Sequence, residues 1–170
     1  MPKAAVPAAK KAKKTLFVLM PFGDGPAQPL PCRYEFTCNY DQWYDEILRP
    51  AGEEAGFTVS RADEGPGGVP IMEQVWAEIQ NADAIVAFLT GRNPNVYYEL
   101  GLAHSLGKPV LLIADKREKI PFDLVHLRHY LYDDNWVDRV GKFKPEIQQH
   151  LEGIARDPDK AVYRLFAQRP

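Results

Sequence analysis

The chain has 170 residues and 45% hydrophobic content, which is enough for one ordinary domain with a substantial core. Its formal net charge is −2, but the first fifteen residues hold five of the 21 Lys and Arg and no acid, which leaves 16 basic against 23 acidic residues. An acidic body argues against nucleic-acid binding as the main task. No apolar stretch approaches the roughly 20 residues that cross a bilayer, so we predict a cytoplasmic protein without a membrane partner.

The N-terminal residues 1–14 form an Ala/Lys/Pro tail that cannot bury enough apolar area to offset its ordering entropy, so we predict disorder. Residues 15–20 predict the first strand. The segment 23–39 has too many glycines and prolines for a regular element, and we predict a loop that lies over the carboxyl edge of the sheet as a lid. We expect the tail and this loop to be the most mobile parts of the chain.

The middle of the chain alternates between helical and strand patterns. Residues 40–55 have apolar residues at helical spacing, with a kink or break expected at Pro50. Residues 57–61 predict a strand, and residues 71–82 predict a helix that packs on the sheet. The apolar runs 84–89 and 110–114 are typical of strands covered on both faces.

The C-terminal part completes the pattern. Residues 120–124 predict a turn or short helix, residues 129–132 an edge strand, and residues 137–155 a helix interrupted near Pro145. Residues 156–170 are expected to form a loosely attached tail. The order of elements predicts a single α/β domain over residues 15–155, a flavodoxin-like three-layer sandwich with a parallel five-stranded sheet.

Residues 91–109, GRNPNVYYELGLAHSLGKP, are the most informative stretch. Asn93 can cap a helix, Pro94 suits its first position, and Gly107 can end it. Glu99 lies inside this helix, among residues suited to burial. It is either a solvated glutamate or a site carboxylate, held ionised by the helix dipole and by donors from residues 93–95. Ligands of open α/β sheets bind outside the carboxyl ends of the strands, where this helix begins.

Two cysteines, Cys32 and Cys38, stand close together without a second pair of ligands. The pattern does not support a four-ligand zinc site, and a reducing compartment argues against a disulfide. We predict two ordinary thiols, no metal site and no cofactor.

Four segments carry a resemblance to a known family: FVLMPFG at residues 17–23, Ala82-Asp83 before the third predicted strand, NPNVYYELGLAH at residues 93–104, and GKPV at residues 107–110. Together they resemble the nucleoside 2-deoxyribosyltransferase-like family. The resemblance implies that Glu99 is the nucleophile that attacks the anomeric carbon of a nucleoside. It also matches Asp83 to a family aspartate, although a capping or turn role is an equal alternative. Asn93 or Asn95 stands where the family usually has another aspartate, and Met20 where it has a glycine.

The same stretch is similar to the TIR domains, in which a glutamate on the helix after the third strand is required for cleaving the glycosidic bond of NAD. The two families share the fold, so the fold does not separate them. The resemblances imply a small-molecule partner, namely a nucleoside, a nucleotide or NAD, and we expect a homo-oligomer.

The implied chemistry is coherent. Breaking an N-glycosidic bond builds oxocarbenium character at the sugar carbon, which one ionised carboxylate can trap or stabilise, while a second group assists the base or activates water. We predict Glu99 and Asp83 as catalytic residues. The predicted substrate-binding residues are Phe22, Gly23, Asp63, Arg92, Asn93, Asn95 and Tyr98. Of these, Phe22, Gly23, Asp63, Arg92 and Asn95 should share one cleft with Glu99 and Asp83 at the carboxyl edge of the sheet. We predict cleavage or transfer at the N-glycosidic bond of a nucleoside or nucleotide. Two alternatives stay open: a TIR-like NAD hydrolase in defence or signalling, and a non-catalytic nucleotide-sensing or interaction module.

Overall fold

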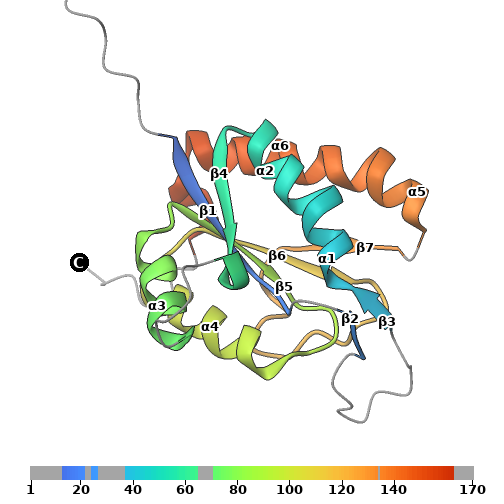
Figure 1. Cartoon of the computed structure of the whole chain (residues 1–170), viewed down its shortest axis with the longest axis horizontal. Coiled ribbons are helices and arrows are strands. Elements are labelled where there is room, and N and C mark those ends of the chain that lie inside the picture. Colours follow the sequence, from blue (N-terminus) through green and yellow to red (C-terminus); the bar gives the residue numbers. More distant parts are fainter. Residues whose placement is uncertain (1–12, 22–23, 27–36, 65–70, 134, 163–170) are drawn as a thin grey trace, which may run out of the picture.

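The computed structural model describes residues 13–21, 24–26, 37–64, 71–133 and 135–162. Its centre is a five-stranded parallel sheet with the strand order β4-β1-β5-β6-β7. The strands are β1 (Lys14–Leu19), β4 (Phe57–Arg61), β5 (Ala84–Phe88), β6 (Val110–Asp115) and β7 (His129–Tyr132). Helices cover both faces of the sheet, α3 and α4 on one side and α1, α2 and α6 on the other (Figure 1). The flavodoxin-like sandwich predicted from the sequence is confirmed.

The sheet is buried on both faces because its central strands are apolar throughout. Successive side chains of β1 point to opposite sides: Leu16 and Val18 join the core under α1, α2 and α6, whereas Phe17 and Leu19 join the core under α3 and α4. All five residues of β5 are buried. This two-sided burial explains why these strands read as continuous apolar runs in the sequence.

Two long helical segments contain a π-helical turn directly before a proline. The first consists of α1 (Tyr40–Trp43), a π turn (Tyr44–Leu48) and α2 (Arg49–Glu54), which contains Pro50. The last consists of α5 (Trp136–Asp138), a π turn (Arg139–Phe143) and α6 (Lys144–Arg156), which contains Pro145. Proline lacks an N–H and its ring clashes with the carbonyl group four residues earlier, so a wider turn accommodates it. The interruptions predicted at both prolines are therefore confirmed.

The predicted loop over residues 23–39 contains regular structure. Strands β2 (Asp24–Pro26) and β3 (Thr37–Asn39) pair in an antiparallel ladder, with Pro26 opposite Thr37. The prediction of no regular element here was wrong for these residues, since an isolated two-stranded ladder tolerates a proline that a central strand would exclude. Residues 22–23 and 27–36 lie outside the described residues, as do 1–12 and 163–170, so the lid and the expected mobility stay predictions.

The remaining helices are α3 (Ile71–Asn81) and α4 (Pro94–Ser105), which pack against each other, and two 3₁₀ turns, over Ala62–Glu64 and Pro158–Ala161. Val162 then forms a β-bridge with Pro109 next to β6. This part of the predicted C-terminal tail is therefore attached to the sheet. Within the described ranges, no helix is both long enough and apolar enough to cross a membrane.

Gly52 marks the closest approach of α2 to the sheet. A Cβ atom at this position would lie 2.6 Å from Val59 Cγ2 and 2.8 Å from Leu16 Cδ2. We expect Gly52→Ala to lower the free energy of unfolding by about 1–3 kcal/mol, because overpacking outweighs the gain in helix propensity. Urea denaturation measures the change.

Gly101 provides the matched control in the interior of α4, where a Cβ atom would meet no described atom within 4 Å. Gly101→Ala should raise the free energy of unfolding by about 0.5–1 kcal/mol. Equal effects of the two substitutions would contradict the close packing of α2 on β1 and β4.

Candidate active site

Helix α4 begins after a short loop with an unusual backbone. Gly91 has φ of 83° and Arg92 has φ of 51°, a conformation that is costly for a residue with a Cβ atom. The largely buried carboxylate of Glu118 fixes both residues, accepting from the Gly91 N–H at 2.8 Å and from Arg92 Nε at 3.1 Å. Arg92 Nη2 also donates to the carbonyl oxygen of Lys119 at 3.0 Å. The loop is thus tied to the segment that follows β6, which fixes the start of α4.

Replacing Glu118 tests this anchoring. Glu118→Ala should lower the free energy of unfolding by about 2–3 kcal/mol, because it removes a charge-assisted bond from Arg92 and leaves the Gly91 N–H without its acceptor. Glu118→Gln retains an acceptor for the Gly91 N–H, so its free energy of unfolding should fall less than that of Glu118→Ala. Chemical denaturation measures both, with Glu53→Gln on the exposed surface of α2 as control. Equal stability of the alanine variant and the control would show that the loop before α4 keeps its conformation without Glu118.

The beginning of α4 matches the sequence prediction. Asn93 is the N-cap and its side-chain oxygen accepts from the Asn95 N–H at 2.9 Å, with Pro94 as the first helical residue. Val96, Leu100 and Ala103 face the core. The capping bond uses the Asn93 oxygen.

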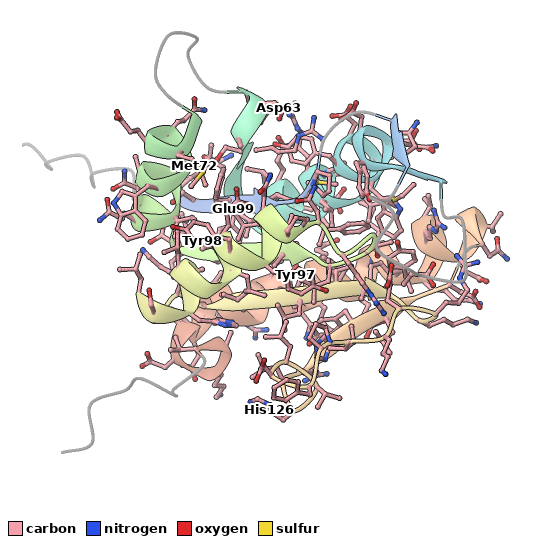
Figure 2. The ribbon with its side chains drawn as sticks, turned by 90° about the horizontal axis from the view of Figure 1, so that it is seen from below. Asp63, Met72, Tyr97, Tyr98, Glu99 and His126 are labelled. Atoms are coloured by element: carbon pink, nitrogen blue, oxygen red, sulfur yellow. The ribbon has the colours of Figure 1, made fainter. Side chains whose placement is uncertain are left out.

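Glu99 lies beside the buried stripe of α4 and is half-buried. Figure 2 shows it between α4 and the Met72 end of α3, with Tyr97 on the other side of the helix. Among the described residues no group donates a hydrogen bond to its carboxylate. Burial therefore raises the pKa of Glu99 to about 7.

This setting changes the expectation for Glu99. The sequence predicted an environment that holds the carboxylate ionised, whereas burial raises its pKa to about 7, so the ionised and the protonated forms are both populated near neutral pH. The reason is that Glu99 lies in the second turn of α4, beyond the first turn where the helix dipole acts, and that it receives no donor from the Asn93 cap. The solvated glutamate stays an alternative, because a half-buried side chain keeps part of its surface exposed.

Asp63 is held by Arg61 at the end of β4. Its two carboxylate oxygens accept from Arg61 Nε and Nη2, each at 2.6 Å, and Arg61 Nη1 also lies 2.8 Å from Asp41. Arg61 is only 7% exposed, so it forms the centre of this ion-pair group. As placed, the Asp63 carboxylate neutralises Arg61.

Asp83 lies at the amino edge of the sheet, opposite the carboxyl edge from which the loop to α4 leaves. It precedes β5, and its carboxylate accepts from the backbone N–H of Thr15 at 2.7 Å at the start of β1. The Asp83 N–H in turn donates to the Thr15 carbonyl at 3.0 Å. The expectation that Asp83 joins Glu99 in one cleft is therefore corrected, because a residue before a parallel strand lies at the amino edge.

The other predicted site residues differ in placement. Asn95 and Tyr98 project from α4 into solvent, and Tyr98 is 60% exposed. Arg92 is engaged by Glu118 as described. Phe22 and Gly23 lie outside the described residues. Of the predicted set, the structure brings Arg92, Asn93, Asn95, Tyr98 and Glu99 to the first turns of α4 and its preceding loop.

Polar groups close the carboxyl ends of the strands, and of these groups the sequence offered only Glu64, as a weaker site candidate. Glu64 accepts from the Tyr44 hydroxyl at 2.6 Å and pairs with Arg49, and the guanidinium groups of Arg49 and Arg61 both lie over the Tyr44 ring. At the ends of β5, β6 and β7, Thr90 Oγ1 accepts from the Tyr132 hydroxyl at 2.8 Å and from the Asp115 N–H at 2.9 Å. The signal in the sequence that could have indicated these groups was the presence of polar residues at the ends of apolar strands.

Comparisons with known proteins add a structural likeness. No protein-family model matches the chain, and no curated protein matches its sequence. Among solved structures, the chain is similar to the CMP N-glycosidase BcmB of Clostridium botulinum, with 17% sequence identity and a TM-score of 0.48. That similarity covers 81% of this chain and 98% of the other. The resemblance to the transferase-like family stays a prediction.

Proposed function

We propose that this chain cleaves the N-glycosidic bond of a nucleoside or nucleotide, with Glu99 as the catalytic carboxylate. The observation that carries the proposal is the half-buried carboxyl of Glu99, which has no hydrogen-bond partner among the described residues and a pKa raised to about 7. Carboxyl groups with perturbed pKa values gather at functional sites. The resemblance of residues 93–104 to the transferase-like family supports the same role.

The reaction begins with ionised Glu99 facing the anomeric carbon of the sugar. The bond between C1′ and the base nitrogen breaks, its electron pair stays on the base, and the base takes up a proton from solvent. A Glu99 oxygen bonds to C1′, and water then displaces it and loses a proton, which yields the free sugar and restores the carboxylate. Attack by a second base in place of water would give transfer.

No proton is routed through Asp63 or Asp83 in this proposal. Asp63 accepts two hydrogen bonds from Arg61, and Asp83 is bonded to Thr15 at the far edge of the sheet. Glu99 is therefore the only one of these three carboxylates that takes part in the proposed reaction. The half-buried setting suits it because a water-poor site strengthens the attraction between a carboxylate and a developing cation.

A substrate panel tests the proposal. The protein is incubated with deoxynucleosides, ribonucleosides, nucleoside monophosphates and NAD, and free base or nicotinamide is measured by chromatography. We expect release of base from at least one nucleoside or nucleotide. Release of nicotinamide alone would favour the NAD hydrolase, and saturable binding without any product would favour the sensing module.

A further inference from the structure

A cavity of about 630 Å³ lies at the amino edge of β6 and β7. Its described lining comes from the C-terminal ends of α4 and α6, the segment before β7, and the 3₁₀ turn over Pro158–Ala161. Neither Glu99 nor any other predicted site residue is among that lining. The volume falls within the roughly 300–1,000 Å³ of small-molecule sites.

The cavity combines apolar walls with cationic side chains. The apolar part is formed by Leu111, Leu127, Ile154, Ala161 and Val162. The charged lining residues are Arg128, Arg156, Asp157 and Lys160. Lys160 Nζ lies 3.0 Å from Asp157, so these two charges offset each other. The positive charges of Arg128 and Arg156 remain.

Both arginines are positioned without being neutralised. The Arg128 guanidinium lies 5.1 Å from the centre of the Tyr130 ring, and no carboxylate in the described part of the chain pairs with it. Arg156 Nε donates to the carbonyl oxygen of Glu152 at 3.3 Å, an interaction that leaves its positive charge without a described counter-charge. Two such guanidinium groups in the lining of one cavity of an acidic protein favour the binding of an oxyanion there.

Neutral polar groups complete the lining. The His150 ring lies 4.1 Å from the Tyr130 ring, and His104 reaches the cavity from the end of α4. Burial lowers the pKa of both histidines, so both imidazoles are neutral at neutral pH. A neutral imidazole can donate or accept a hydrogen bond, which suits the polar atoms of a ligand body.

We infer that this cavity binds a small anionic molecule, with its phosphate or carboxylate group at Arg128 and Arg156 and an apolar or aromatic body against Leu111 and Ile154. The apolar walls supply burial and the guanidinium pair supplies charge-assisted hydrogen bonds. This site is independent of the proposed cleavage, because its lining is separate from Glu99.

The test titrates the full chain with 1-naphthyl phosphate by calorimetry, beside 1-naphthoate, 1-naphthol and inorganic phosphate. We expect saturable binding of at least one aromatic anion, at least about tenfold tighter than 1-naphthol, because the neutral compound lacks the charge-assisted bonds. The two anions distinguish a phosphate site from a carboxylate site. Equal affinity for 1-naphthol, or no saturable binding of either anion, would overturn the inference.

Variants and spectra locate the ligand. The double substitution Arg128→Gln and Arg156→Gln should weaken binding at least about tenfold. Lys142→Gln, which removes an exposed cation outside the cavity lining, and Glu99→Gln should leave it unchanged. Amide chemical shifts of Leu111 and Gly153 should move on titration of the wild type, a readout that needs no variant. Shifts confined to α3 and the start of α4 would place the ligand elsewhere and reject this site.

Discussion

Glu99→Gln should lower glycosidic cleavage by about 100- to 1000-fold or more while the protein stays folded. The substitution keeps the size of the side chain and its helix propensity but removes the negative charge that stabilises the developing oxocarbenium ion. Burial opposes ionisation of Glu99, so a neutral amide costs the fold nothing by loss of charge. Release of base and thermal melting, measured on the same samples, separate a chemical defect from an unfolded protein.

Glu53→Gln is the matched control for this prediction. Glu53 is an exposed glutamate of α2, on the opposite face of the sheet from α4, and its substitution should change neither turnover nor melting temperature. Full turnover in a stably folded Glu99→Gln variant would end the assignment of Glu99. Saturable nucleotide binding by that variant, without product from the wild type, would support the sensing module instead.

The fold could be predicted because its signals are local. The apolar runs of β1, β5 and β6 reflect burial on both faces, and Asn93-Pro94 places the start of α4 through a cap that uses neighbouring residues. Each of the two helix interruptions could be predicted from a single residue, Pro50 or Pro145. The β2–β3 ladder was missed because it joins two segments of three residues each, and β2 contains a glycine and a proline that disfavour a strand by local propensity.

The candidate site was predicted less completely because its groups meet across long sequence separations. Glu118 holds Arg92, and Arg61 pairs with Asp41, and no local spacing reveals either pairing. Asp83 is the instructive error. Its position before β5 already places it at the amino edge of a parallel sheet, and the family resemblance outweighed that simple argument.

The pH dependence of cleavage follows from the raised pKa of Glu99. The carboxyl has an ordinary pKa of 4.5 and a folded-state pKa of about 7, with burial as the cause. If the ionised form reacts, kcat/KM should be constant above pH 7 and fall about tenfold per pH unit below it, reaching a loss of roughly 100-fold at pH 5. A general-acid role would give the opposite profile, with activity lost above pH 7.

The same pKa predicts a stability difference between wild type and Glu99→Gln. Between pH 4.5 and 7 the folded carboxyl keeps a proton that the unfolded chain releases, so the free energy of unfolding of the wild type falls as pH rises through this window. Glu99→Gln removes this penalty, and its advantage should grow to about 1–3 kcal/mol and level off above pH 7. Urea denaturation of both proteins at pH 4, 5.5, 7 and 8.5 gives this difference. The contributions of the other titrating groups cancel, because both proteins contain them. A constant difference across the series, together with a flat kcat/KM profile, would mean that Glu99 titrates like an exposed glutamate and would remove the basis for its catalytic assignment.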